Sequence, residues 1–569
     1  MKGDKVMTNR KWLKTGLAVV MASVMLITGC GSNNSNNGNN GGTSTNTGSN
    51  AVEDNSPVTY TYFSFASGKD VLASETVIGK KLQEQTNVDW KMEFAIGDVA
   101  TKSGVMIAGG DYPDIISPDG EIEKLLDAEA FIPLNDLIEE HGPNIKRVYG
   151  DYYDMMKADD GNIYILPYSA NIGYVSEPDV GQGAFWIQRR VLKEFNYPQI
   201  DTLEEYFNLI EQYEAKYPSV DGKDTIGFMT YAGVADNFFT ITNAAMHLAG
   251  YPNDGGVVVD MDTHEAKVYA ATDIEKQWVQ SLNVLNNKGL LDPETFTANR
   301  DQYLAKITSG RVLGYFNYGW QVGEATNVLK EGDDDYRYVP LPITYSADIA
   351  DQYLDAPSFI NNRGMGISVS TKDPVRIIKY FDNLLKEENQ ILVQWGEQGV
   401  TYEVDENGRY YMTDEQISQR NDNEFKRSYG FQYFEYNWPR YGSLSELSNG
   451  NAYAVGSQPE VASASHTDGD KLILEKYGVK VFSELFTEPA ERPWYPAWSI
   501  TKEQGSPEQV FEQKSSDLQQ KYYPKLVFAK PAEFESVWNE YVAEFNKLDV
   551  AGYESFVTKK VQERVAGIW

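Results

Sequence analysis

The alternation of hydrophobic and polar positions predicts a strand, a helix and a second strand where ordered structure begins. Residues Val58–Phe65 are mostly β-branched and aromatic, and Val88–Phe94 alternates, so both stretches favour strands. Residues 71–86 between them have helical spacing. A second helical stretch at Ala100–Ala108 runs through two glycines into a short apolar strand. Strands alternating with helices indicate an α/β fold with a parallel sheet, whose ligands bind at the carboxyl ends of the strands.

Three later patterns predict local structure by the same reasoning. Asn407 and Gly408 lie between the β-favouring stretches Thr401–Val404 and Arg409–Met412, which indicates a hairpin. Trp186 begins an apolar strand and is expected to be buried. Near the C-terminus an apolar stripe at helical spacing is expected to face the core: Phe534, Trp538, Tyr541, Val542 and Phe545.

The first 29 residues have the pattern of a signal peptide. Basic residues precede an uncharged run from Thr15 to Ile27, which is too short to span a membrane comfortably. The segment Leu26–Cys30 resembles a bacterial lipobox, at which a secreted precursor is lipidated on the cysteine and cut just before it. Cys30 is also the only cysteine of the sequence. We therefore expect residues 1–29 to be removed and Cys30 to carry a diacylglyceryl membrane anchor.

Residues 30–57 are expected to form a tether between the lipidated cysteine and the folded body. After Cys30 the composition is almost entirely Gly, Asn, Ser and Thr, which cannot bury a core. The physical role of such a segment is to hold the body near the membrane while allowing it to move.

Composition and charge exclude several classes of function. The net charge is −33 for the whole chain, and it becomes −37 without the first 29 residues, which carry five bases and one acid. Such a surface repels nucleic acid and anionic lipid. With Cys30 lipidated there is no disulfide, and the four histidines lack metal-ligand spacing, so neither a metal nor a cofactor is expected. The excess of 38 Tyr, 24 Phe and 11 Trp suits cores and sugar-stacking surfaces alike.

Several motifs follow one another in a characteristic order. They are Ala108–Ile116, Phe131–Leu137, Gly161–Tyr168, Phe185–Arg190, Ile307–Gly314 continuing to Trp320, Gly364–Pro374 and Trp395–Gly408. With the lipobox and tether, they are similar to those of family 1 extracellular solute-binding proteins of bacterial ABC importers. More narrowly, the chain resembles the large lipoproteins of Gram-positive bacteria thought to serve uptake of complex oligosaccharides.

The resemblance implies an α/β fold of two lobes, the type II arrangement of periplasmic binding proteins, with a hinge and a ligand cleft between the lobes. The implied boundaries are residues 58–175 and 365–485 for the first lobe and 180–360 and 490–569 for the second. The chain is expected to cross the hinge near 168–186, 361–366 and 485–498. Gly-rich and Pro-rich composition supports the last two crossings.

The resemblance places several loops at this cleft, where a sugar needs rings for stacking and polar groups for its hydroxyls. The expected ligand contacts are Trp320, Trp494, Trp498, Tyr168, Asp111, Arg363 and Trp395, with Tyr495 beside Trp494. Trp395 has packing against the sheet as its alternative, and Asp111 and Arg363 have a turn residue and a surface residue as theirs. An aromatic loop with Tyr429, Tyr433, Tyr436 and Trp438 either lines an extended subsite or packs on the lobe.

Many members of this family carry a calcium loop after the helix that corresponds to residues 202–216. Here the segment Tyr217–Gly227 keeps two acidic side chains, Asp221 and Asp224. Calcium takes six to eight oxygen ligands, so no metal site is expected there.

The leading functional hypothesis is a monomeric, lipid-anchored receptor on the extracellular face of the plasma membrane. It would capture a carbohydrate by lobe closure and deliver it to an ABC permease, with no bond broken. One alternative is an extracellular carbohydrate-active enzyme, because the many acids leave a hydrolytic carboxylate pair open. Another is a lipoprotein that senses sugar for a membrane kinase.

Overall fold

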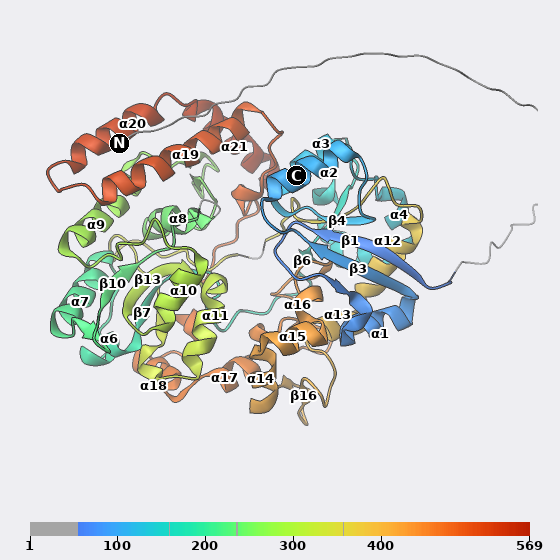
Figure 1. Cartoon of the computed structure of the whole chain (residues 1–569), viewed down its shortest axis with the longest axis horizontal. Helices are drawn as coiled ribbons and strands as arrows, with labels where there is room; N and C mark the ends of the chain where they lie inside the picture. Colours follow the sequence, from blue (N-terminus) through green and yellow to red (C-terminus); the bar gives the residue numbers. More distant parts are fainter. Residues whose placement is uncertain (1–54, 159, 235–236, 357, 569) are drawn as a thin grey trace, which may run out of the picture. The chain divides into compact units, whose positions relative to one another are not determined.

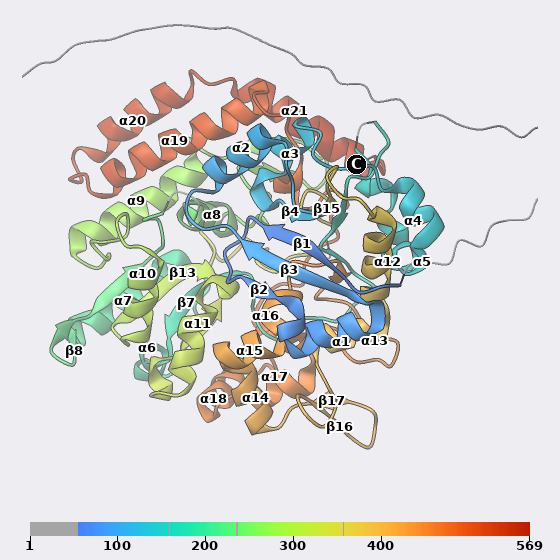
Figure 2. The same cartoon turned by 45° about the vertical axis from the view of Figure 1, so that its right-hand side comes forward.

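The computed structural model describes residues 55–158, 160–234, 237–356 and 358–568, which build two α/β lobes (Figures 1 and 2). The expected α/β fold with two lobes is confirmed. The expected signal peptide, Cys30 and the tether as far as residue 54 lie outside these ranges.

Lobe 1 is organised around a mixed sheet with the strand order β2-β3-β1-β4-β15-β5. Its strands are β1 (Val58–Ser64), β2 (Val71–Leu72), β3 (Val88–Phe94), β4 (Ile115–Ser117), β5 (Ile165–Pro167) and β15 (Gly364–Ile367). Strand β1 is parallel to β3 and β4, whereas β15 is antiparallel to β4 and β5. A strand from the later part of the chain therefore completes the sheet that the N-terminal part begins.

The helices of lobe 1 come from the same two parts of the chain. They are α1 (Val77–Thr86), α2 (Val99–Gly109), α3 (Ile122–Asp127), α4 (Asn135–His141), α5 (Pro143–Tyr149), α12 (Pro374–Leu384), α13 (Glu387–Gln394), α14 (Asp414–Asn421), α15 (Asn423–Tyr429), α16 (Phe431–Phe434) and α17 (Pro459–Ser465). Trp90 and Trp438 meet edge to face with ring centroids 5.3 Å apart, and both are fully buried. This pair joins strand β3 to the loop after α16 within one core.

Lobe 2 is built on a sheet with the order β10-β13-β7-β14: β7 (Gly183–Gln188), β10 (Ile226–Met229), β13 (Val312–Tyr318) and β14 (Tyr338–Leu341). Its helices are α6 (Arg189–Glu194), α7 (Leu203–Lys216), α8 (Phe239–Leu248), α9 (Asp273–Lys288), α10 (Arg300–Thr308), α11 (Gly319–Lys330), α18 (Asp468–Tyr477), α19 (Pro507–Val527), α20 (Phe534–Phe545) and α21 (Val550–Val565). Helices α19 and α20 contact α9, at the upper left of Figure 1.

Short strand pairs complete both lobes. They are β6 (Ser169–Ala170) with β18 (Arg440–Tyr441), β8 (Ser219–Val220) with β9 (Lys223–Asp224), β11 (Val257–Val259) with β12 (Ala266–Val268), and β16 (Glu403–Val404) with β17 (Tyr410–Tyr411). The last pair confirms the predicted hairpin, with Gly408 at φ 80°, a left-handed conformation that suits glycine.

Most of the local predictions are confirmed, with one shift. Strands β1 and β3 and helix α2 form where the pattern predicts them, and Trp186 is buried, as is nearly all of the C-terminal apolar stripe. Helix α1, however, begins at Val77 instead of residue 71. The Thr76 side chain caps it by accepting a hydrogen bond from the amide of Gly79, and the two residues of β2 pair with β3 instead.

The hinge crossings differ from expectation at the third position. Residues up to Val461 pack in the core of lobe 1, whereas Ile473 and Leu474 of α18 pack in that of lobe 2. The chain thus returns between these positions, not at 485–498, and the boundary of lobe 1 at residue 485 is corrected accordingly.

Ion pairs give the physical reason for this early return. Asp470 of α18 pairs with the buried Arg189 and also lies 2.6 Å from Arg337, both in lobe 2. A buried charge is stable only when it is paired, so α18 packs in lobe 2, where these arginines lie. Sequence pattern alone does not reveal which arginine an aspartate will meet.

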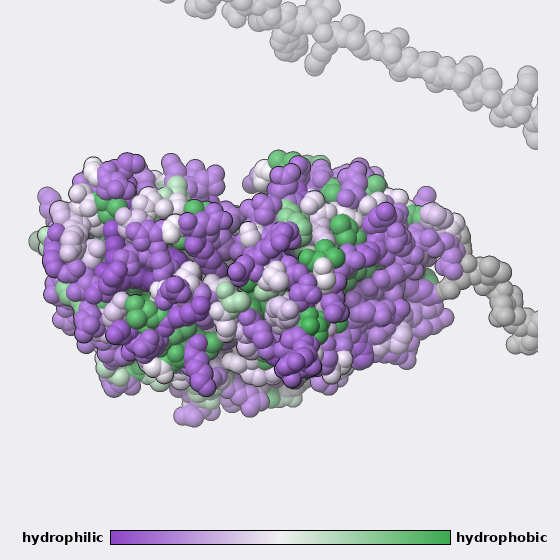
Figure 3. Space-filling model, turned by 90° about the horizontal axis from the view of Figure 1, so that it is seen from below, coloured by the Kyte–Doolittle hydropathy of each residue, from purple (hydrophilic) through white to green (hydrophobic). Residues whose placement is uncertain are grey.

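The surface seen in Figure 3 is mostly hydrophilic, with hydrophobic residues in scattered groups. This agrees with the large excess of acidic residues. Within the described ranges, no helix combines the length and apolar character needed to cross a membrane.

Candidate ligand-binding site

A cavity of about 770 Å³, here called cavity 1, is lined by residues of both lobes. Lobe 1 contributes residues that include Ser169, Asn171, Arg363, Arg440 and Ser443, and lobe 2 contributes residues that include Asn243, Asn253, Tyr318, Trp320, Tyr495 and Trp498. The connecting segments between the lobes add Glu177, Gln182 and Asp355. The volume lies in the range of small-molecule sites, about 300–1,000 Å³.

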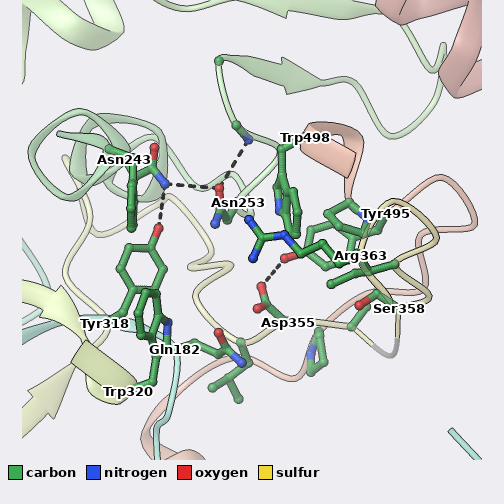
Figure 4. A pocket seen from close by; sticks show the side chains of 18 of the residues that line it. Gln182, Asn243, Asn253, Tyr318, Trp320, Asp355, Ser358, Arg363, Tyr495 and Trp498 are labelled. Atoms are coloured by element: carbon green, nitrogen blue, oxygen red, sulfur yellow. Dashed lines mark hydrogen bonds between the residues drawn. The ribbon is translucent and has the colours of Figure 1, made fainter. Parts of the chain in front are cut away.

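Trp320 forms one side of this cavity. It is the second residue of α11, directly after β13, and its side chain is 63% exposed, although it lies among other rings. Its ring is nearly parallel to that of Phe239, with centroids 6.4 Å apart. The Trp320 ring also lies 6.0 Å from that of Tyr318, centroid to centroid (Figure 4). The amide of Trp320 donates to the carbonyl of Gly181, which fixes the start of the helix. An open, fixed ring of this kind offers a stacking face for the apolar side of a sugar.

Trp498 and Arg363 form another part of the wall. The Arg363 guanidinium lies 5.5 Å from the Trp498 ring centroid, and Figure 4 shows the two side chains beside each other. Gly255 makes room for this indole: a Cβ there would lie 2.8 Å from the Trp498 Cβ, and the residue has φ +79°. Only glycine suits both conditions, so the position of Trp498 depends on it.

Hydrogen bonds hold the polar side chains of the cavity in place. The Asn243 Nδ2 donates to the Tyr318 hydroxyl at 2.7 Å and to the Asn253 Oδ1 at 3.2 Å, and the Gly255 amide donates to the same Oδ1. These contacts appear as dashed lines in Figure 4. A preformed network of this kind reduces the entropy lost when hydroxyl groups of a ligand bind.

Two carboxyl groups give the cavity an unusual electrostatic character. Burial, with the nearby Asp355 and Asp179, raises the pKa of Glu177 to about 7. Burial also raises the pKa of Asp355 to about 6, although this carboxyl accepts a hydrogen bond from the Tyr495 hydroxyl. A carboxyl with a pKa near neutrality accepts a hydrogen bond when ionised and donates one when protonated. Both forms can contact sugar hydroxyls.

The structure brings together three of the predicted ligand contacts. Trp320, Trp498 and Arg363 all line cavity 1, as does Tyr495. Tyr168 lies one residue before the lining residue Ser169, and its hydroxyl is hydrogen-bonded to the Ser117 hydroxyl. Asp111 is exposed after α2 and is not part of the wall of cavity 1.

Two tryptophans predicted as ligand contacts are core residues instead, and these assignments are corrected. Trp395 is fully buried in lobe 1, where its indole donates to the carbonyls of Ala452 and Tyr453. Trp494 is buried in lobe 2, where Asp254 accepts from its indole at 3.4 Å and from the amide of Ala497 at 2.7 Å. In both cases partners distant in sequence satisfy the indole N–H, which therefore needs no ligand.

The sequence reasoning missed the polar part of the wall, notably Asn243, Gln182, Glu177 and Asp355. Glu177 and Gln182 fall inside the predicted first crossing, so their position in a connecting segment was an available signal. Asn243 lies within α8 and is buried like its neighbours, so no local pattern distinguishes it.

The segment that departs from the calcium-loop pattern forms the hairpin of β8 and β9, and both Asp221 and Asp224 are exposed there. Across the described ranges, no group of three or more His, Cys, Asp or Glu side chains is arranged to hold a metal ion.

Known proteins resemble the chain in sequence and in fold. It is 28% identical over 255 residues to the fructooligosaccharide ABC transporter substrate-binding protein FusA of Streptococcus pneumoniae. That match covers 43% of this chain and 47% of FusA, so it spans about half the length of this curated relative.

Solved structures share the fold, among them the following two. FusA of S. pneumoniae in complex with kestose has a TM-score of 0.66 at 20% identity, covering 90% of this chain and 100% of that one. An HMO-binding, ABC-transporter associated solute-binding protein of Bifidobacterium longum infantis has a TM-score of 0.64 at 13% identity, covering 90% and 99%. The profile of one family matches residues 78–392, more than half of the chain. The chain therefore belongs to the family of bacterial extracellular solute-binding proteins.

Proposed function

We propose that this protein captures an oligosaccharide outside the cell and delivers it intact to an ABC import permease. The observation that carries the proposal is Trp320, a ring 63% exposed yet placed in a cavity between two lobes. Around it lie hydrogen-bonding groups such as Asn243, Gln182 and Asp355. Exposed rings together with fixed polar groups suit a carbohydrate better than a wholly apolar ligand.

The relatives support a carbohydrate as the ligand class. FusA is named for fructooligosaccharides, and the Bifidobacterium protein is described as binding HMOs. At these identities the ligand of one relative does not transfer to this chain. Fructooligosaccharides are therefore only one of the sugar series that a binding screen should include.

Membrane attachment through Cys30 is a second part of the proposal. A lipidated receptor on the extracellular face of the plasma membrane of a Gram-positive bacterium would stay close to its permease. In a Gram-positive host, the Cys30→Ser variant is expected to appear in the medium, whereas the unaltered chain remains with the membrane fraction. Equal release of both forms would refute the anchor without affecting the binding proposal.

A thermal-shift screen of the secreted chain from residue 31 onward tests binding. A ligand at about 100 times its Kd stabilises the native state by about 2.7 kcal/mol, which raises the melting temperature measurably. We expect a neutral oligosaccharide series to give the largest shift and to be recovered intact after overnight incubation.

The alternatives predict other outcomes. Cleaved sugar would identify a carbohydrate-active enzyme that uses acids such as Glu177 and Asp355. Binding of intact sugar without loss of sugar uptake in a deletion strain would favour a sensor. No shift with any sugar would refute the oligosaccharide assignment.

A further inference from the structure

A second cavity of about 560 Å³, here called cavity 2, adjoins cavity 1. The two share wall residues: Glu177, Gln182, Trp320, Arg440 and Ser443. The Trp320 side chain therefore forms part of the wall of each cavity. Cavity 2 also takes residues from both lobes, among them Val322 of α11 and Tyr436 of the loop after α16. The two cavities therefore meet at Trp320 and the other shared wall residues.

Two of the aromatic side chains that line cavity 2 are unusually open. Among the described residues, the two most exposed aromatic side chains are Trp320 at 63% and Tyr436 at 60%, and both line this cavity. Exposed rings are normally avoided because water contact with apolar surface is unfavourable. Two such rings in one cavity indicate a ligand with apolar faces.

Tyr436 is held in a fixed position by its neighbours. Tyr433 and Trp438 on either side are buried in the core of lobe 1, with Trp438 stacked on Tyr62 at 5.5 Å between ring centroids. The Arg440 guanidinium lies 5.7 Å from the Tyr436 ring. The loop is therefore anchored in the core on both sides of the ring, an arrangement that lowers the entropic cost of stacking.

The charges of cavity 2 favour a neutral ligand. Its acidic side chains are Glu177, Asp179, Glu435 and Asp470, and its basic ones are Lys330, Arg337, Arg440 and His466. Arg337 pairs with Asp470 at 2.6 Å, and His466 contacts Asp179 at 3.2 Å. Glu435 is paired with Arg420 at 3.1 Å. Neither sign dominates, so the wall does not select a strongly acidic or basic chain.

We propose that one neutral oligosaccharide occupies both cavities, passing Trp320, with a distal sugar unit stacked on Tyr436. The protein then prefers chains longer than those that fill cavity 1. This inference rests on the proposed oligosaccharide function and adds a chain-length preference with a named residue that sets it.

Calorimetric titration with neutral oligosaccharides of increasing length tests the inference. The probes are fructooligosaccharides from kestose upward, with xylo- and malto-oligosaccharides of matched lengths, on the wild type and on Tyr436→Ala. Tyr411→Ala is the control, because Tyr411 is also exposed in lobe 1 but lines neither cavity. All three proteins should have similar melting temperatures without ligand.

We expect wild-type affinity to rise with length, and Tyr436→Ala to lose about tenfold for long members while binding the shortest member normally. Tyr436→Phe should keep most of the affinity because it retains the ring. Equal binding of all lengths by wild type and Tyr436→Ala would overturn the inference and leave the function intact. Failure of every series to bind would instead remove the proposed function itself.

Discussion

The guanidinium of Arg363 lies 5.5 Å from the ring centroid of Trp498, so a residue that precedes strand β15 of lobe 1 contacts a ring of lobe 2. The contact joins the two lobes at the wall of the cavity. The side chain of Arg363 remains about half exposed, at 50%, which leaves donors available to a ligand.

Arg363 is expected to contribute to ligand affinity without contributing much to stability. Exposed cation–π contacts are worth about 0.5–1 kcal/mol, so Arg363→Ala should leave the melting temperature nearly unchanged while lowering affinity for the bound sugar several-fold. Arg363→Lys should restore only part of it, because lysine lacks the planar guanidinium. Titration calorimetry measures the sugar affinity of both variants, and a thermal melt measures their stability. The matched control is Arg300→Ala, an exposed arginine paired with Glu324 at 3.1 Å outside both cavities; an equal loss there would contradict a specific role.

Trp320 is expected to be the main stacking residue. Truncation of an aromatic anchor typically costs about 2 kcal/mol or more, so Trp320→Ala should weaken sugar binding by about thirtyfold or more. Its exposed position predicts little change in the melting temperature without ligand. Val328→Ala on the same helix serves as the control, because Val328 is 60% exposed and lines neither cavity. Unchanged affinity in Trp320→Ala would argue against stacking at this ring.

The stability of the protein should depend on pH through Glu177. Burial raises its pKa from 4.5 to about 7, so the folded protein holds this proton more tightly than the unfolded chain does. The stabilisation is complete below about pH 4.5 and is lost as the pH rises to about 7. Glu177→Gln, which cannot ionise, should show a smaller fall in melting temperature over that interval. An equal change in the melting temperatures of the two proteins between pH 4.5 and 7 would refute this contribution.

Trp395 provides a test of the corrected assignment. As a buried core residue, Trp395→Ala should destabilise the fold by about 3–5 kcal/mol, and Trp395→Phe by less. The sugar affinity of the folded Trp395→Phe protein, measured well below its melting temperature, should equal that of the wild type. A lost affinity with an unchanged melting temperature would return Trp395 to the ligand site.

Local pattern determined much of the fold. The alternation in β1 and β3, the helical stripe that ends at Phe545 and the turn residues Asn407 and Gly408 depend on neighbours in the chain. Periodicity encodes which face of an element is apolar, and that information is contained in a short window. Family resemblance further indicated two lobes and placed Trp320 and Trp498 at the cleft.

The exposure of aromatic residues in loops was decided only by tertiary structure. Trp494 and Trp498 lie four residues apart in one proline-containing loop, yet Trp494 is buried on Asp254 and Trp498 lines cavity 1. Similarly, the aromatic loop of lobe 1 buries Trp438 and leaves Tyr436 open in cavity 2. Whether a loop ring is buried depends on partners hundreds of residues away, and no local periodicity records them. The return of the chain at α18 has the same cause, because it is set by where Asp470 meets Arg189 and Arg337.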